Sequence, residues 1–244
     1  MATAKTGYRQ GLGIGSKGET EMTARSLALL ALSALALALM GAVARAEVVG
    51  KTAVALDGAK ARQAECSLGD LVADAAREEM KADIALVPAS QFRKVTLPVG
   101  ELTREALTDA LLYPDERIVL AEVTGAQLLA ALERGLSMLP DKPNTAFLQV
   151  AGMSVSFRSD ASEGQRVLGV HIGSSALLTE QKYKAAMPLS LAKGALGYFR
   201  VFDGLAPKET GPAIGEAVAD YVAEKKVVSP QPGRLQDLTP SKER

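Results

Sequence analysis

The sequence predicts an α+β fold in which a mixed β-sheet packs against helices. Apolar residues recur at helical spacing in the first half of the chain, and alternation typical of antiparallel strands begins after Pro143. A last helical pattern follows, and helices and strands do not alternate as regularly as in a parallel α/β protein. Because no repeat or linker interrupts this order, we expect one domain over residues 47–235.

Residues 1–46 are expected to be an export signal. Residues 27–40 carry no charge, Arg25 precedes them, and an Ala-x-Ala site ends at Ala46. A positive residue, a short apolar run and a small-residue cleavage site are typical of a secretory signal peptide. By length alone a membrane anchor is the alternative, and the cleavage site favours removal of the segment.

Met22 is the expected start of translation. Residues 1–21 are rich in glycine, threonine and charge, which is unusual ahead of a signal peptide. We therefore expect a mature chain that begins near Glu47 and has no stable membrane anchor. No cysteine lies at the cleavage point, so no lipid anchor is expected. The product would be exported, and periplasmic if the source is Gram-negative.

The first half of the mature chain begins with two capped helices and a strand between them. The spacing predicts a helix over 67–80 with Ser67 as its N-cap, and a short buried strand over 84–87. A second helix is predicted over 103–112, with Thr103 as its cap and a proline soon after its end.

A second strand and a third helix follow. Residues 117–123 are rich in Ile and Val and predict a buried strand. Thr124 and Gln127 have the spacing of a capping box, in which each side chain bonds the backbone N–H of the other residue. The helix that they open is expected to bury a row of leucines as far as Leu136.

The second half of the chain changes period. Residues 153–157 alternate between apolar and polar and predict a half-buried strand, with 167–172 as the return strand of a hairpin. Residues 183–187 predict another short strand, and 212–225 a final amphipathic helix. Residues 236–244 are polar and charged and are expected to fray.

The composition excludes several kinds of site. The 28 basic and 28 acidic residues balance, which argues against a nucleic acid polymer as partner. The single cysteine, Cys66, excludes an internal disulfide and a multi-cysteine zinc site. The single histidine, His171, excludes a site of several imidazoles and has no visible catalytic partner. We expect no metal, no cofactor and no catalytic residue in this chain.

Eight short blocks stand in an order that resembles one known family. They are residues 65–75 (ECSLGDLVADA), 82–86 (ADIAL), 100–103 (GELT), 122–128 (EVTGAQL), 131–135 (ALERG), 147–152 (FLQVAG), 197–198 (GY) and 233–235 (GRL). Together they resemble the C-terminal domain of the 5′-nucleotidases over residues 62–235, which implies the fold of that domain.

The resemblance implies a division of labour. Members of the family hydrolyse nucleotides and related phosphate esters with a dinuclear metal centre and an Asp–His pair, both carried by a separate N-terminal metallophosphatase domain. A two-metal site needs several converging ligands, and this chain has one histidine. We therefore expect an orphan C-terminal domain that is inactive on its own.

In the family this domain recognises the substrate, with two aromatic rings that sandwich the base and with Arg and Asn side chains. Residues 88–93 correspond to the family's N-G-G-G-I-R loop and keep only its arginine, Arg93. Arg62 fits a second family arginine. Tyr113 stands beside the position of the first ring, where this chain has Pro114.

The second ring and an acidic residue are replaced as well. Ser190 stands at the ring position, and Leu196 replaces the Asp of a G-G-D-G motif. Stacking contributes roughly 1–3 kcal/mol per base, so affinity for a nucleobase is expected to fall. Arg93, Arg62 and Tyr113 remain as candidate ligand-binding residues.

Three functions stay open from the sequence. The first is a non-catalytic binding module for a nucleotide-like or other small anionic ligand. The second is the specificity subunit of a split hydrolase whose metallophosphatase chain is separate. The third is a protein-interaction module with no small-molecule ligand.

Overall fold

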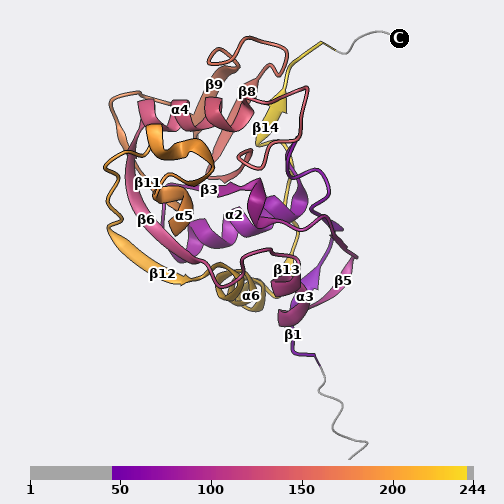
Figure 1. Ribbon diagram of the computed structural model, residues 1–244. Helices are drawn as coiled ribbons and strands as arrows, with labels where there is room; N and C mark the ends of the chain where they lie inside the picture. Colours follow the sequence, from indigo (N-terminus) through magenta and orange to yellow (C-terminus); the bar gives the residue numbers. More distant parts are fainter. Residues whose placement is uncertain (1–45, 241–244) are drawn as a thin grey trace, which may run out of the picture. The chain divides into compact units, whose positions relative to one another are not determined.

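A five-stranded mixed sheet forms the centre of the computed structural model, which describes residues 46–240 (Figure 1). In spatial order its strands are β12 (Glu209–Ala213), β6 (Arg117–Thr124), β11 (Lys182–Pro188), β3 (Ile84–Pro88) and β7 (Leu148–Ala151). β3 and β11 are parallel, and the other neighbours are antiparallel. The predicted α+β class with a mixed sheet is confirmed. The expected signal peptide lies, apart from Ala46, outside the described residues.

Helices cover both faces of this sheet. They are α2 (Ser67–Glu79), α3 (Arg104–Asp109), α4 (Gly125–Leu136), α5 (Leu189–Ala192) and α6 (Ile214–Lys225), with the 3-10 turns η1 (Ala89–Gln91) and η2 (Ala195–Arg200). α2 and α6 pack together on one face, and α4 and η2 belong to the core of the other. In Figure 1, α2 lies with α6 below it and α4 above it.

Strand β3 shows why an unbroken apolar run marks the centre of the sheet. Ala85 and Val87 belong to the core beneath α2 and α6, whereas Ile84 and Leu86 belong to the core beneath α4. Successive side chains of a strand point to opposite faces, so a strand covered on both sides is apolar throughout. The predicted buried strand over 84–87 is therefore confirmed as β3.

Three smaller sheets flank the central one. The first is β10 (Ser175–Ala176), β9 (Val167–Ile172), β8 (Met153–Phe157) and β14 (Leu235–Asp237); the second is β13 (Val227–Val228), β1 (Val48–Thr52) and β5 (Gly100–Thr103); the third is β2 (Leu56–Asp57) with β4 (Thr96–Leu97). The predicted hairpin is confirmed as β8 and β9, with Val155 opposite Val170.

The start of α2 differs from the prediction by one residue. Cys66, not Ser67, is the N-cap, and its Sγ accepts a hydrogen bond from the Gly69 N–H at 3.3 Å. The Ser67 hydroxyl instead donates to the Ala55 carbonyl at 2.8 Å and accepts from the Asp57 N–H. Ser67 therefore fastens the preceding loop to the helix, a long-range role that local spacing does not reveal.

Element ends differ at three further places. α3 ends at Asp109 rather than near 112, and α6 begins at Ile214 because the residues before it form β12. The segment expected to fray is ordered at its start, since β14 runs to Asp237 and Leu238 N–H donates to the Phe157 carbonyl at 2.7 Å. The capping box of Thr124 is confirmed.

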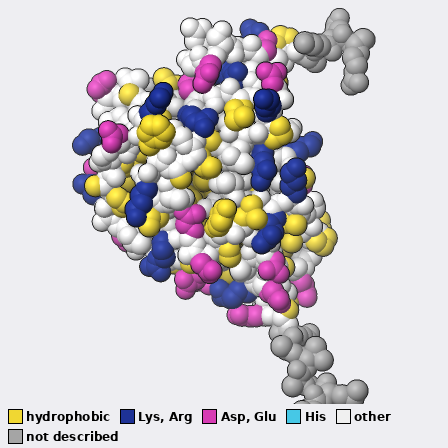
Figure 2. All heavy atoms as spheres, viewed as in Figure 1, with side chains coloured by type: hydrophobic (Ala, Val, Ile, Leu, Met, Phe, Trp, Pro, Cys, Tyr) yellow, Lys and Arg dark blue, Asp and Glu magenta, His cyan; other side chains and the backbone are white. Residues whose placement is uncertain are grey.

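The surface mixes charges of both signs. Figure 2 shows lysine and arginine side chains interspersed with acidic and apolar ones over the visible face. Among residues 46–240, no helix has both the length and the apolar character needed to cross a bilayer.

Candidate functional site

The topology of the central sheet brings three distant segments to one end. β11 is parallel to β3 and antiparallel to β6, and Pro188 at the end of β11 lies opposite Ile118 at the start of β6. The carboxyl ends of β3 and β11 therefore meet the amino end of β6. η1 follows β3 at this end, residues 112–116 lead into β6, and α5 with η2 follows β11.

These three segments line a cavity of about 550 Å³. Its wall is formed by Ser90 and Gln91, by Leu112 to Glu116, and by Ser190, Ala195 and Leu196. The volume falls within the roughly 300–1,000 Å³ that is usual for small-molecule sites. The cavity is therefore large enough for a ring system such as a nucleobase.

Glu116 joins the three parts of the wall. Its Oε1 accepts a hydrogen bond from the Ser190 N–H at 2.8 Å, and its Oε2 accepts one from Nε2 of Gln91. Its own N–H donates to the Tyr113 carbonyl at 3.1 Å, and its carbonyl accepts from the Ile214 N–H at 2.8 Å. One side chain thus fixes the relative positions of η1, the segment before β6, and α5.

Gln91 presents an unsatisfied acceptor in this wall. The side chain is 1% exposed, and the Glu116 carboxylate, which can only accept, requires the amide nitrogen to face it. The amide oxygen Oε1 then has no hydrogen-bond partner among residues 46–240. Such a buried acceptor costs about 1–3 kcal/mol, so a bound donor that satisfied it would gain affinity.

The third part of the wall is a left-handed turn. Leu196 has φ +58° and Gly197 has φ +86°. Nη2 of Arg134, on α4, donates to the Leu196 carbonyl at 2.7 Å, and a Cβ on Gly197 would lie 2.8 Å from the same guanidinium. A left-handed conformation is unfavourable for leucine by about 1–2 kcal/mol. The hydrogen bond from Arg134 offsets this cost and holds the turn in place, and Arg134 can approach because Gly197 has no Cβ.

Of the three residues expected to bind a ligand, Tyr113 lines the cavity. Tyr113 is 58% exposed, so its side chain is accessible to a ligand. Arg93 is exposed beside the wall, where its Nε donates to the Leu111 carbonyl at 3.1 Å. Arg62 is half-buried in a turn, and its carbonyl accepts from the Asn144 N–H at 2.8 Å. The two arginines are not among the lining residues.

The loops that carry Arg62 and Arg93 are neighbours. Gly58 N–H donates to the Val95 carbonyl at 2.9 Å, and a Cβ on Gly58 would lie 2.8 Å from the Arg93 carbonyl. No ion pair is recorded for either arginine in the described part of the chain. The charged residues of the lining are both acidic, Asp115 and Glu116. Positive charge thus stands beside the cavity and not inside it.

Sequence reasoning missed Gln91, Glu116 and Arg134. Gln91 lies within the 88–93 loop that the family resemblance selects, which was the one available signal. Local spacing gave no signal for Glu116 or Arg134, because their partners are 74 and 62 residues away.

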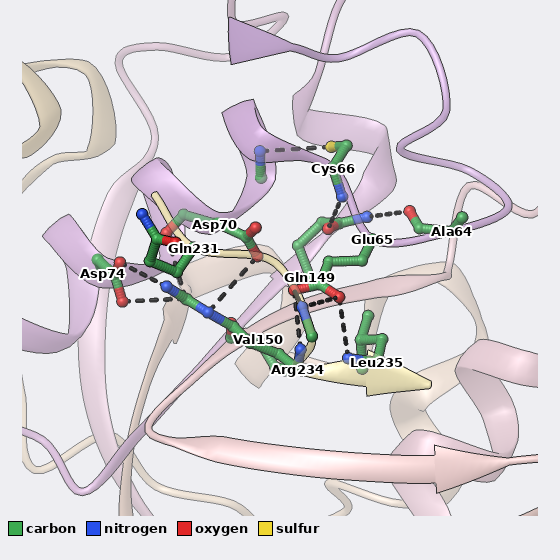
Figure 3. A network of polar contacts seen from close by, with 12 residues as sticks. Ala64, Glu65, Cys66, Asp70, Asp74, Gln149, Val150, Gln231, Arg234 and Leu235 are labelled. Carbon is green, nitrogen blue, oxygen red and sulfur yellow. Dashed lines mark hydrogen bonds and ion pairs between the residues drawn. The ribbon is translucent and has the colours of Figure 1, made fainter. Parts of the chain in front are cut away.

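Three of the eight sequence blocks that carried the resemblance, residues 65–75, 147–152 and 233–235, meet elsewhere, in a polar network beside α2 (Figure 3). The Glu65 carboxylate accepts hydrogen bonds from the N–H groups of Gly233, Arg234 and Leu235 at 2.9–3.1 Å. The Arg234 guanidinium makes a bidentate pair with Asp74, at 2.9 and 2.7 Å. These blocks therefore fasten the end of the chain to α2.

Burial governs the two acids at the centre of that network. Burial raises the pKa of the Cys66 thiol to about 12, which outweighs the favourable hydrogen bond from Gly69. Burial likewise raises the pKa of Asp70 to about 8, although the nearby Arg234 guanidinium acts in the opposite direction. Cys66 is thus a packed thiol rather than a nucleophile. Within the residues that the structure describes, no cluster of three or more His, Cys, Asp or Glu side chains is arranged to hold a metal.

Comparison with known sequences agrees with this architecture. A family profile described as "5′-nucleotidase, C-terminal domain" matches residues 48–204, and the chain belongs to this family. An apyrase of Anopheles gambiae is 28% identical over 193 residues, which cover 75% of this chain and 33% of the apyrase. The trifunctional nucleotide phosphoesterase protein YfkN of Bacillus subtilis is 33% identical over 163 residues, which cover 62% of this chain and 11% of that protein.

Solved structures show the same fold. A 5′-nucleotidase precursor from Thermus thermophilus superposes with a TM-score of 0.72 at 29% identity, covering 87% of this chain and 43% of that one. An NAD nucleotidase of Haemophilus influenzae has a TM-score of 0.65 at 17% identity, covering 79% of this chain and 38% of that one. The chain thus spans less than half of each of these proteins.

Proposed function

We propose that this chain is a non-catalytic binding domain for a nucleoside or nucleotide, which it holds in the cavity beside Tyr113. The carrying observation is a cavity of about 550 Å³ lined by an exposed tyrosine, in a chain of the 5′-nucleotidase C-terminal domain family. Relatives are named as an apyrase and as a nucleotide phosphoesterase, which supports a ligand of nucleotide type.

In this proposal the base enters the cavity and stacks on Tyr113. Stacking on one ring is worth about 1–3 kcal/mol. The amide of Gln91 and the carboxylate of Asp115 provide acceptors for the polar edge of the base. A phosphate would stay outside the cavity, because Asp115 and Glu116 repel it and Arg93 attracts it from beside the wall.

Thermal and calorimetric titration tests this function. The purified chain is titrated with adenosine, AMP, uridine, UMP and inorganic phosphate. A ligand at 100 times its Kd should stabilise the fold by about 2.7 kcal/mol. Tyr113→Ala should weaken binding by about tenfold, as expected from the loss of one stacking contact.

Phe199→Ala is the matched control, because Phe199 is 59% exposed and lies outside the cavity lining. It should bind like the wild type. Arg93→Gln should weaken AMP and UMP more than adenosine and uridine. Equal losses in Tyr113→Ala and Phe199→Ala would contradict the site, and the absence of any response would favour the interaction-module alternative.

A second candidate is a specificity subunit for a separate metallophosphatase chain. The observation that favours it is that the matched relatives are more than twice as long as the matched part of this chain. Mixing the chain with a family metallophosphatase domain should then produce a complex by gel filtration and nucleotide hydrolysis. Two separate elution peaks would count against this candidate.

Export is also part of the proposal, and residues 27–46 support it. Cell fractionation should find the chain outside the cytoplasm with its amino terminus near Glu47. Deletion of residues 23–46, which keeps Met22 as the start, should keep it in the cytoplasm. A cytoplasmic, uncleaved full-length product would contradict export.

A further inference from the structure

A second, larger cavity lies at the opposite end of the central sheet. Its volume is about 940 Å³, and it is lined by α2, by the starts of β3 and β11, by the β7–β8 turn and by the β9–β10 hairpin. The cavity beside Tyr113 shares none of these residues. The two cavities are therefore separate.

Four charged side chains line the larger cavity, and three of them have partners. Arg234 is paired with Asp74 at 2.7 Å, as Figure 3 shows, and also donates to the Val150 carbonyl at 3.0 Å. Asp83 accepts a hydrogen bond from the Lys184 N–H at 2.8 Å through Oδ2. The fourth is Arg77, on the last turn of α2.

Unlike the other three charged side chains, Arg77 has neither an ion pair nor a side-chain hydrogen bond in the described part of the chain. Among residues 46–240 no carboxylate oxygen lies within 4.0 Å of its guanidinium. Its Nε is the one buried side-chain nitrogen of the described residues that has no hydrogen-bond partner. A guanidinium cannot lose its proton in a protein. A partly buried charge of this kind is normally paired, so the wall has positive charge without its counter-ion.

The backbone around Arg77 holds the side chain in the wall. Gly152, in the β7–β8 turn, has φ +76°, and a Cβ there would lie 2.9 Å from Cδ of Arg77 and would overlap the Asp83 carbonyl. The turn therefore packs directly against the stem of Arg77. Ser154 and Ser175 line the same cavity, and a serine hydroxyl can donate a hydrogen bond.

We propose that this cavity binds a small ligand through an oxyanion, a carboxylate or phosphate group, that pairs with the Arg77 guanidinium. The planar fork of arginine matches both groups. Ser154 and Ser175 supply neutral donors, and the volume leaves room for an organic part beyond the anion. Asp83 is the one lining carboxylate that is not ion-paired, and it disfavours a second negative charge on the ligand.

The test is a titration followed by backbone amide NMR at constant ionic strength. The purified chain receives acetate, succinate or inorganic phosphate, with chloride as the reference salt. We expect saturable shifts of the Gly152, Ser154 and Ser175 amides. Acetate and phosphate distinguish a carboxylate ligand from a phosphate ligand. Shifts that do not saturate, or that chloride reproduces, would overturn the proposal.

Arg77→Gln should weaken this binding by at least about tenfold, because it removes the charge-assisted pair. Arg77→Lys should retain part of it. The matched control is Arg117→Gln, an exposed arginine at the other end of the sheet, which should bind the anion like the wild type. The amide spectrum of each variant shows whether it is folded. Unchanged binding by a folded Arg77→Gln variant would overturn the assignment.

Discussion

Asp70 is a carboxyl group that the fold keeps protonated near neutral pH. It is 1% exposed, and burial raises its pKa from 3.8 to about 8, even though Nε of Arg234 lies 3.7 Å from Oδ1. Between these two pKa values the folded chain binds a proton that the unfolded chain has lost. The free energy of unfolding must therefore fall as the pH rises through this window.

Asp70→Asn should remove that dependence on pH. In the wild type, this group lowers the free energy of unfolding by up to about 1.4 kcal/mol per pH unit between pH 4 and 8. Asparagine stays neutral, so urea unfolding at pH 5, 6.5 and 8 should show a flatter profile for the variant. Asp203→Asn, at an exposed turn, is the control and should keep the wild-type slope. Equal slopes in Asp70→Asn and wild type would refute the buried-acid interpretation.

The residue scale also shows what the sequence can reveal. The capping box of Thr124 and Gln127 was predictable because its hydrogen bonds span three residues. Tyr113 was found because it stands next to a family ring position. Gln91 and Glu116 were not found, because 25 residues separate them and their pairing exists only after the sheet has formed.

At the scale of elements, Glu116 should control the assembly of the cavity. Glu116→Ala removes the acceptor of two hydrogen bonds, one of them from the buried amide of Gln91. Hydrogen bonds to charged groups contribute about 1.5–3 kcal/mol each. We expect Glu116→Ala to lower the free energy of unfolding by at least about 3 kcal/mol and to abolish nucleoside binding.

Denaturant unfolding and the titrations described above measure both effects. Asp115→Ala is the neighbouring control for the unfolding measurement only, because no hydrogen bond or ion pair of its carboxylate is recorded among the described residues. It should change the free energy of unfolding by less than about 0.5 kcal/mol. Similar destabilisation by the two alanines would show that Glu116 does not join the wall segments.

Long elements were predictable and short ones were not. α2 and α4 carry clear apolar periodicity and β3 is an unbroken apolar run, so their positions followed from local sequence. β13 and β14 are two and three residues long and lie in a polar, proline-containing segment. They form because they pair with β1 and β8, and the sequence of residues 227–237 alone does not reveal these partners.

At the scale of the whole molecule, we expect the chain alone to hydrolyse no nucleotide. A two-metal site needs several ligands around ions about 3.5–4 Å apart. The chain has one histidine, His171, which is exposed on β9. AMP incubated with the purified chain and Mg²⁺, Mn²⁺ or Zn²⁺ should release no phosphate above the protein-free control. Metal-dependent release that scales with the concentration of the chain would contradict this expectation.

The contact between α2 and Arg234, directly before β14, has a consequence for how the protein is made. Arg234 and Asp74 are 160 residues apart, and β14 forms the edge that covers β8. A ribosome releases the amino-terminal part first, so α2 waits for its last partner until nearly all of the chain has been synthesised. Folding that depends on such distant contacts is slow. We propose that this chain is exported, and slow folding would leave the newly made polypeptide unfolded long enough to pass through a translocation channel.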